Sequence, residues 1–336
     1  MVDISTNLGR LELPSPVLTA SGCAAAGKEL DNYFDITKIG GIVTKSIMLD
    51  ARAGRPTPRM AETPSGMLNS IGLQGPGIES FLEHDLAWLR ERGARSIVSI
   101  AGNNVAEFGR LARKLWGADG IAAIEVNISC PNVANRGLVF ACNLGSAQEV
   151  MAEVRKNAPS GIPLLAKLSP DVTDIVEIAR GVVEAGADGL SMINTLLGMV
   201  IDPVTLRPKL GGRTGGLSGP AIRPVAVRAV YQVHAAMPKV PILGMGGIRT
   251  ERRGAHFLCA AAVVTPDGRE RVVEGTIEGV LTTAPAGSGG FGYDPIFKPH
   301  GFDVTTAQLS PAEKNAISHR GAAFRALAPV LIELLG

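Results

Sequence analysis

Polar side chains stand at the ends of several apolar, strand-like runs of this chain. Ser21, Lys45, Asn127, Lys167 and Asn194 all occupy such positions. An asparagine amide offers both a donor and an acceptor edge, and a lysine is rarely buried without an anionic partner. Because the carboxyl ends of parallel strands meet at one face of a sheet, this pattern predicts a site for a carboxylate or an amide-rich ring. The alternative for the lysines is a structural ion pair.

The NISCPN stretch at residues 127–132 adds a thiol, Cys130, to this set. A thiol can accept a proton when its pKa is lowered or when a bound substrate aligns it. The alternative is a buried, inert cysteine. The polar neighbours of Cys130 favour the functional interpretation. Cys23, Cys142 and Cys259 lie in small or apolar surroundings, and we expect them to be inert.

Two glycine-rich loops could approach a phosphate through their backbone amides. They are Gly215–Pro220 and Gly244–Gly247, and in barrel folds a phosphate often lies near the last two strands. Either loop alone is also an ordinary turn, since glycine runs are common at turns.

The elements that must position these residues alternate along the first 250 residues. Expected strands are 17–21, 41–46, 96–101, 123–129, 164–168, 189–194 and 240–244, and most are too apolar to have a solvent-facing side. Expected helices are 78–91, 105–116, 147–157, 172–185 and 221–236, with Ser169–Pro170 as a helix start. An N-terminal hairpin is expected over 1–16, with its turn at Asn7–Gly9.

This alternation predicts either a (β/α)8 barrel or a doubly wound sheet. Polar residues follow many of the strands, whereas a doubly wound sheet gathers its ligand residues at one switch point. No GxGxxG motif follows the first strand. We therefore expect an α/β, TIM-type barrel that lacks its last β/α unit.

The pattern changes after Thr250. Residues 257–264 and 271–280 predict an antiparallel hairpin around Pro266–Gly268, and a capping box at Ser310–Glu313 predicts a final helix. The last 86 residues hold 6 of the chain's 14 aromatic residues, which indicates a separate origin. The expected domains are therefore 1–250, an incomplete barrel, and 251–336, an α+β fragment.

Composition limits the function classes. The chain has 33 basic and 31 acidic residues and a net charge of +2, so nothing suggests a nucleic-acid or anionic-membrane partner. No signal peptide or membrane-length apolar run is visible, and the four cysteines form no CxxC pair. We expect a cytoplasmic protein with no disulfide framework and no metal site.

Together these residues resemble the catalytic subunits of class 1B dihydroorotate dehydrogenases, which use FMN. The resemblance extends from the N-terminus to about Thr250, and it is carried by Thr44–Ser46, Pro56–Arg59, Glu62–Gln74, residues 127–132, Ile193–Thr195 and Gly246–Gly247. The ETPSGMLNSIGLQ loop at 62–74 and the cysteine, where quinone-linked relatives carry serine, indicate the NAD-linked branch.

The resemblance implies a role for each matching residue. Cys130 would remove the C5 proton of dihydroorotate while a hydride leaves C6 for the flavin N5. The implied substrate-binding residues are Lys45, Asn69, Ser70, Ile71, Gly72, Leu73, Asn127, Asn194 and Thr195. The implied FMN-binding residues are Ser21, Lys45, Ser46, Asn127, Lys167, Ile193, Gly219, Gly246 and Gly247.

The resemblance also implies partners. Members of the family pass electrons to a separate subunit that carries FAD and a 2Fe–2S cluster and reduces NAD, so we expect a homodimer assembled with such subunits into a heterotetramer. Two departures from the family stand out. Ser99 replaces an asparagine that relatives often carry near the flavin, and the helix and eighth strand whose Val–Gly–Thr turn helps bind the FMN phosphate are absent.

From about Arg252 the chain instead resembles the C-terminal part of the inosine/xanthosine triphosphate pyrophosphatases. The matching stretches are Gly289–Pro295, Leu309–Asn315 and Ser318–Gly321, which cover less than half of that family's chain. The resemblance implies contacts with a purine nucleotide from Phe291, Gly292, Tyr293, Asp294, Lys314, His319 and Arg320. The phosphate loop and the acidic Mg²⁺-binding segment of that family have no counterpart here.

Dihydroorotate oxidation in pyrimidine biosynthesis is the function that these observations favour. Three alternatives remain at this stage: an inactive fusion product that does not retain flavin, a nucleoside triphosphate pyrophosphatase acting through the tail, and an FMN oxidase with another substrate. The sequence leaves open whether the junction near Thr250 is biological.

Overall fold

The computed structural model of the chain describes residues 3–129, 140–248, 254–265, 267–282, 284–290 and 292–335. The chain packs as two compact units, Met1–Arg249 and Thr250–Gly336. Each unit has its own hydrophobic core and is described here by itself.

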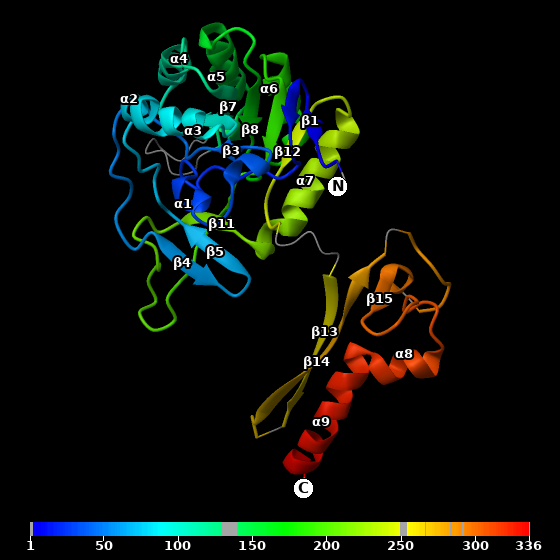
Figure 1. Cartoon of the computed structure of the whole chain (residues 1–336). Helices are drawn as coiled ribbons and strands as arrows, with labels where there is room; N and C mark the ends of the chain where they lie inside the picture. The colour runs from blue at the N-terminus through cyan, green and yellow to red at the C-terminus, as the bar shows by residue number, and fades with distance from the viewer. Residues whose placement is uncertain are drawn as a thin grey trace. The chain divides into compact units, whose positions relative to one another are not determined.

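A parallel sheet forms the centre of the first unit (Figure 1). Its strand order is β12–β9–β8–β7–β6–β3, with β3 at Ile42–Val43, β6 at Ser96–Ile100, β7 at Ile121–Asn127, β8 at Leu164–Lys167, β9 at Gly189–Met192 and β12 at Ile242–Gly244. Leu18 forms an isolated parallel bridge to Gly41 beside β3, where a longer first strand was expected. Strands β6, β8 and β9 are buried along their whole length, as expected for a sheet covered on both faces.

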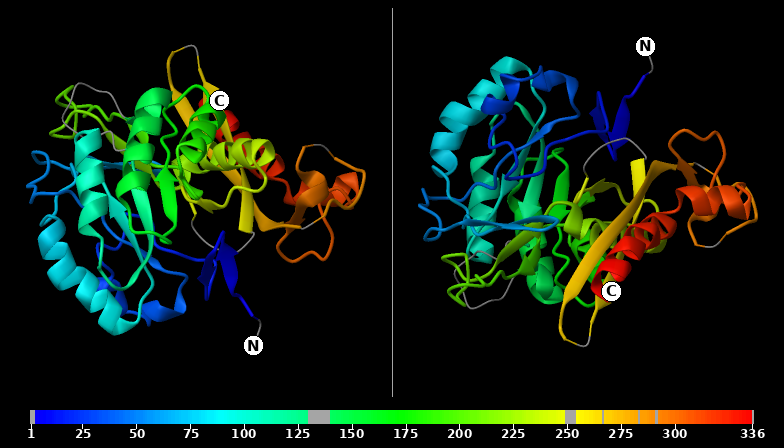
Figure 2. Two further views of the ribbon diagram at one scale, coloured as in Figure 1. Left: turned by 90° about the horizontal axis from the view of Figure 1, so that it is seen from above. Right: turned by 90° about the horizontal axis from the view of Figure 1, so that it is seen from below.

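Helices follow the strands and cover the outside of this sheet (Figures 1 and 2). They are α1 Lys28–Asp31, η1 Ile36–Lys38, α2 Ile78–Ser80, the π-helix η2 Phe81–Leu86, α3 Ala87–Arg92, α4 Val105–Lys114, η3 Phe140–Cys142, α5 Leu144–Asn157, α6 Ile175–Glu184, η4 Pro220–Ile222 and α7 Arg223–Ala236. Outward-facing strand residues such as Ile124 and Val126 pack with helix residues such as Phe108 and Val150 in the main core.

The other face of the strands lines the interior of the curved sheet. Val43, Ile97, Ala123 and Leu165 form an apolar layer there, and Leu8 and Leu11 pack against it. These two leucines come from an N-terminal hairpin of β1 Thr6–Leu8 and β2 Leu11–Leu13. Because side chains alternate along a strand, the next inward layer contains Ser99, Glu125 and Lys167. The interior is thus apolar at its amino end and polar toward its carboxyl end.

A second sheet, antiparallel and in the order β10–β11–β5–β4, lies at the carboxyl ends of the parallel strands. Its strands are β4 Met60–Thr63, β5 Gly66–Asn69, β10 Leu196–Gly198 and β11 Gly215–Ser218. This sheet was not expected from the sequence. It brings Asn69 next to Gly216 through backbone pairing.

The second unit is an α+β fragment built on a long hairpin. Strands β13 Gly254–Val264 and β14 Glu270–Leu281 pair antiparallel, and the short β15 Phe297–Pro299 pairs with the end of β14. Helix α9 His319–Leu335 packs on the hairpin, with Ala323 and Leu327 against Ala261, and α8 Pro311–Ile317 and η5 Asp294–Ile296 precede it. The predicted capping box at Ser310 and Glu313 is present at the start of α8.

The expected fold class is confirmed: the first unit is an α/β, TIM-type barrel sheet without a closing β/α unit. Within the described residues β12 pairs only with β9, and its residues are half-buried or exposed, whereas β3, β6, β8 and β9 are buried throughout. An edge strand that has lost its neighbour has this exposure.

Four local predictions were wrong. Residues Gly215–Ser218, expected as part of a glycine-rich loop, form strand β11, because their backbone pairs with β10 and β5. Ser169–Pro170 does not start a helix, because α6 begins at Ile175 and the Asp174 carboxylate accepts hydrogen bonds from the N–H groups of Val176 and Glu177. The N-terminal turn lies at Gly9–Arg10 and not at Asn7–Gly9, since Leu8 pairs with Leu11. The C-terminal helix is two helices, interrupted at Ser318.

No helix in the described part of the chain is long and apolar enough to cross a membrane.

Candidate active site

A cleft of about 470 Å³ lies at the carboxyl ends of the parallel strands. Its walls come from the carboxyl ends of parallel strands and the loops that follow them, from strands β4, β5 and β11 of the antiparallel sheet, and from the loop after β5. The lining residues are Ser21, Gly22, Cys23, Lys45, Ser46, Met60, Met67, Asn69, Ile71, Gly72, Leu73, Asn127, Lys167, Asn194, Thr195 and Ser218. None of these is acidic, so two lysines give the cleft wall a positive charge that suits an anionic ligand.

Three side chains at the ends of β7 and β9 hold one another in place. The Asn194 amide nitrogen donates to the Ser129 hydroxyl at 2.8 Å. The Ser129 hydroxyl donates to the Asn127 amide oxygen at 3.2 Å, and the Asn127 amide nitrogen donates to the Ser46 hydroxyl at 2.8 Å. Each amide therefore has one fixed orientation, which is a requirement for a site that reads donor and acceptor patterns.

A buried polar chain continues from Ser46 into the interior. The Ser46 hydroxyl lies 2.9 Å from the Ser99 hydroxyl, which donates to Oε1 of Glu125 at 3.0 Å. Oε2 of Glu125 lies 3.6 Å from Nζ of Lys167. Glu125 is fully buried and Lys167 is 4 % exposed. The two charges compensate each other inside a region where either one alone would be strongly disfavoured.

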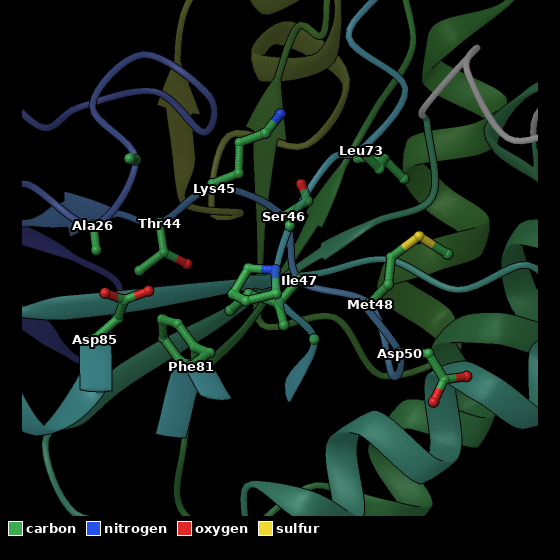
Figure 3. A pocket seen from close by; sticks show the side chains of 14 residues that line it. Ala26, Thr44, Lys45, Ser46, Ile47, Met48, Asp50, Leu73, Phe81 and Asp85 are labelled. Carbon is green, nitrogen blue, oxygen red and sulfur yellow. The ribbon is translucent and has the colours of Figure 1, made fainter. Parts of the chain in front are cut away.

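A smaller cavity of about 140 Å³ lies beside the cleft and shares Lys45, Ser46 and Leu73 with it. Figure 3 shows Phe81 and Ile47 in this cavity, whereas the Lys45 ammonium points away from Phe81. Asp85 at its rim forms an ion pair with Lys28 at 2.7 Å. The segment Thr44–Ser46 thus separates a mainly apolar hollow from the polar cleft.

The glycines that were expected to hold a phosphate pack against the start of α7. Gly219 precedes η4, and Gly247 has a φ of +73°. A Cβ on Gly247 would lie 2.6 Å from Cβ of Arg223, and the Gly247 carbonyl accepts a hydrogen bond from the Arg223 guanidinium at 2.8 Å. Only glycine allows the Gly246–Gly247 loop to approach the helix start this closely, and a helix N-terminus favours anions.

The second unit contains a pocket of about 350 Å³ between the hairpin, the C-terminal half of α8 and the start of α9. The rings of Phe257 and His319 stack with centroids 5.3 Å apart, and Tyr293 lies 6.4 Å from Phe257. Asp294 and Lys314 form an ion pair inside it, and Arg320 is at its wall. Desolvation lowers the pKa of His319 below its usual 6.5; the Arg320 charge acts in the same direction and Asp294 opposes it.

Comparison with known proteins decides the family of the larger part. A family model described as dihydroorotate dehydrogenase matches residues 3–268. The chain belongs to the dihydroorotate dehydrogenase family. A second model, the Ham1 family, matches residues 228–330, so the chain joins segments similar to two families.

Relatives named dihydroorotate dehydrogenase B (NAD(+)), catalytic subunit, are similar to most of the chain. The protein of Desulforamulus reducens is 49% identical over 272 residues, which is 81% of this chain and 88% of the relative. That of Geotalea uraniireducens is 48% identical over 266 residues, covering 79% and 86%. That of Anoxybacillus flavithermus is 42% identical over 296 residues, covering 87% and 93%.

The structure brings most of the expected site residues of this dehydrogenase-family region into one cleft. The expected residues that line it are Ser21, Lys45, Ser46, Asn69, Ile71, Gly72, Leu73, Asn127, Lys167, Asn194 and Thr195. Ser70, Ile193, Gly219, Gly246 and Gly247 do not line it; Ser70 and Ile193 are buried. The expected catalytic residue Cys130 and the nucleotide-pocket candidate Phe291 lie outside the described residues.

Sequence reasoning missed several residues at this site. Met60, Met67 and Ser218 line the cleft from the unpredicted antiparallel sheet. Glu125 was also missed, although its charge within an otherwise apolar strand was a signal that could have identified it. A charged residue in a fully buried strand needs a partner, and Lys167 is on the neighbouring strand β8.

Proposed function

We propose that the first unit, assigned to residues 1–250, oxidises dihydroorotate to orotate with FMN as the hydride acceptor. The observation that carries this proposal is the cleft itself. It gathers two lysines and three asparagines from separate strands, and their hydrogen bonds fix the orientation of Asn127. Such a set of donors suits the carboxylate and ring amides of dihydroorotate together with the polar edge of a flavin.

The residues present fit FMN in two respects. Lys45, Lys167, Ser21, Ser46 and Asn127 offer polar atoms to a flavin ring from the cleft wall. The glycine loop at Gly246–Gly247 lies directly against the start of α7, where a Cβ on Gly247 would collide with Arg223, so its backbone could meet a phosphate beside the helix N-terminus. Gly219 and Ile193 complete the proposed FMN set, and none of the residues that line the cleft is acidic.

Oxidation removes a hydride from C6 of dihydroorotate and a proton from C5. FMN, when bound, supplies the hydride acceptor. The chain supplies the rest: Cys130 would accept the C5 proton, and the lysines would offset the substrate's negative charge. Asn69, Ser70, Asn127, Asn194 and Thr195, with Ile71, Gly72 and Leu73, would orient the substrate ring. Because Asn194 is bonded to Ser129, the residue next to Cys130, its amide ties the substrate site to the proton acceptor.

We propose that electrons leave through a partner. The relatives are named NAD(+)-linked catalytic subunits, and no group of three or more potential metal-binding His, Cys, Asp or Glu residues occurs in the described part of this chain. A separate iron–sulfur flavoprotein subunit carrying FAD and a 2Fe–2S cluster would reduce NAD. The proposed assembly is a homodimer of this chain with two such subunits, in the cytoplasm.

The visible absorption spectrum of the purified chain tests the proposal, recorded before and after anaerobic addition of dihydroorotate. We expect a flavin band that bleaches, and a Cys130→Ser variant that retains the band but bleaches more slowly. A chain that stays colourless with added FMN would mean that the open barrel no longer holds the flavin and that the protein is an inactive fusion. Bound flavin that ignores dihydroorotate would indicate another substrate.

We further propose that the second unit, residues 251–336, binds a purine nucleotide without cleaving it. The aromatic stack of Phe257 and His319 could hold a base, and Lys314 and Arg320 could face its polar edge or phosphates. No cluster of acidic side chains able to hold Mg²⁺ occurs among the described residues. Calorimetric titration with inosine triphosphate should detect binding, and pyrophosphate release with Mg²⁺ would overturn the second half of the proposal.

A further inference from the structure

Glu125 is a buried carboxylate directly beneath the cleft. It stands two residues before Asn127 on β7, so both side chains point into the interior of the curved sheet, while Ile124 and Val126 face the helices. Below Glu125 lies Ala123 of the apolar layer. Glu125 is therefore the charged residue at the boundary between the apolar floor and the polar cleft.

The two carboxylate oxygens of Glu125 have different surroundings. Oε1 accepts a hydrogen bond from Ser99 at 3.0 Å. Oε2 is fully buried, and no described residue donates a hydrogen bond to it; Nζ of Lys167 lies 3.6 Å away. This distance gives strong Coulombic attraction in a low-dielectric interior but exceeds that of a good hydrogen bond.

At this distance Glu125 neutralises the charge of Lys167, while the N–H groups of Lys167 do not have to donate a hydrogen bond to the carboxylate. Lys167 lines the cleft, yet its side chain is only 5 % exposed. A buried ammonium needs a counter-charge, and the acid-free cleft lining offers none. Glu125 supplies it from below, so that the N–H bonds of Lys167 can point to a ligand in the cleft.

The same carboxylate also reaches the asparagine network. Ser99 connects Glu125 to Ser46, and Ser46 accepts the hydrogen bond from Asn127. The fixed acceptor at Glu125 sets the direction of the Ser99 hydroxyl, which leaves Ser46 to donate to Ser99 and accept from Asn127. A single buried residue thus orients two groups of the cleft.

We propose that Glu125 is a positioning residue, which holds Lys167 as a fixed cation facing the flavin and orients Asn127 through Ser99 and Ser46. This inference rests on the proposed function, because it takes the ligand of Lys167 to be FMN. Glu125 itself touches neither flavin nor substrate.

A double-mutant cycle tests the inference with four proteins: the parent, Glu125→Gln, Lys167→Met and the double variant. The first readout is thermal unfolding of the flavin-free chain. Glu125→Gln should lower the Tm, because it leaves the Lys167 ammonium buried without a counter-charge, and adding Lys167→Met should restore most of the loss. Glu149→Gln, an exposed position in the middle of α5, is the control and should leave the Tm unchanged.

The second readout is the FMN dissociation constant, measured by quenching of flavin fluorescence. Each single variant should bind FMN at least about tenfold more weakly, since one charge-assisted hydrogen bond is at stake. The double variant should bind no more weakly than Lys167→Met alone. Glutamine keeps an acceptor oxygen for Ser99 and with it the orientation of Asn127, so Glu125→Gln weakens FMN binding only through Lys167.

Each result has a defined meaning. If Glu125→Gln lowers the Tm equally with Lys167 present or absent, or if its effect on FMN binding multiplies with that of Lys167→Met, the inference is wrong. If Lys167→Met weakens FMN binding and Glu125→Gln does not, the positioning role is wrong even where the Tm values are coupled. If the parent itself binds no FMN, the proposed function fails, and coupling of the Tm values alone then decides whether Glu125 holds Lys167.

Discussion

The amide of Asn194 ties together two strands that are distant in sequence. Its nitrogen donates to the Ser129 hydroxyl at 2.8 Å and lies 3.3 Å from the Ser129 carbonyl oxygen, while its oxygen accepts from the N–H of Thr195. The side chain therefore uses both edges on the protein and still lines the cleft. Loss of this amide would loosen the end of β7 just before Cys130.

Asn194→Ala should consequently harm both folding and activity. The free energy of unfolding should fall by about 1–3 kcal/mol, because buried partners lose their hydrogen bonds. The value of kcat/KM for dihydroorotate should fall roughly 10- to 100-fold. Chemical denaturation and anaerobic flavin reduction measure the two effects. Leu197→Ala, an exposed position three residues later, serves as the control; equal losses in both variants would contradict the assigned role.

His319 makes the stability of the second unit depend on pH. Desolvation, with help from Arg320, lowers its pKa below 6.5. The unfolded chain therefore binds a proton at a higher pH than the folded chain does, so the contribution is complete above about pH 6.5 and is lost as the pH falls from there through the lowered pKa. The melting temperature of this unit should decline over that range, and His319→Phe should flatten the decline. An unchanged decline in that variant would assign it to other groups.

At the residue level, the site residues that could be predicted from the sequence are those whose side-chain type alone indicates a functional role. Lysines and asparagines after apolar strands were expected to meet, and most of them line one cleft. Glu125 and Met67 were missed for different reasons. The role of Glu125 depends on strand register, which pairs Asn127 with Lys167, and Met67 belongs to a strand whose partner β11 is distant in sequence.

At the scale of elements, the contact between the Gly246–Gly247 loop and α7 depends on glycine. Gly247→Ala would place a methyl group 2.6 Å from Cβ of Arg223 at a φ of +73°. We expect a loss of about 1–3 kcal/mol in stability and weaker FMN binding. Gly244→Ala is the matched control, because its new methyl would lie 3.9 Å from Val230, an ordinary contact. Denaturant titration with and without FMN measures both, and similar losses in the two variants would dismiss the proposed cradle.

Strand β13 is an edge strand without the charged residues that usually prevent such a strand from pairing with another chain. It pairs only with β14 among the described residues and carries no Lys, Arg, Asp or Glu, whereas β14 contains Glu270, Arg271, Glu274 and Glu278. An uncharged, apolar edge invites pairing with another chain.

Leu258→Lys should therefore reduce aggregation, because it puts a charge on the exposed face of β13, where Leu258 is 52% exposed. Light scattering at increasing protein concentration is the measurement. Thr276→Lys, on the cross-strand partner in the already charged β14, should have a smaller effect. If both variants behave alike, net charge and not the edge of β13 controls solubility.

The presence of a helix or strand was easier to predict from the sequence than the residues at which it begins and ends. Strands β6 and β8 and helix α4 lie within a few residues of the expected ranges, because a short continuous apolar run indicates a buried strand and an amphipathic helix has a strong periodic signal. The helix start at Ser169 was wrong because Asp174 competes as a cap and offers two hydrogen bonds. The antiparallel sheet was missed because its strands are only three or four residues long.

At the scale of the whole molecule, two separate cores imply two unfolding events. The main core of the first unit and the cluster of Ala261, Ala323 and Leu327 in the second share no residue. Calorimetry should therefore resolve two transitions. Saturating FMN should raise only the first, by several degrees, through about 3–4 kcal/mol of binding linkage at 100 to 1,000 times the Kd. A single transition that moves with FMN would mean that the units unfold together.

The N-terminal hairpin has a consequence for the order of folding. It is synthesised before the rest of the first unit, yet Arg10 forms an ion pair with Asp188 at 3.5 Å, and a Cβ on Gly9 would lie 2.9 Å from the Pro241 ring. These contacts lie most of the first unit's length away in the sequence. Leu8 and Leu11 can pack against Val43 and Ile97 earlier, but the hairpin completes its contacts only after translation has passed β12. The floor of the sheet therefore closes as a late step. A bulky protein fused to the N-terminus should therefore slow the docking of the hairpin and not the formation of the parallel strands.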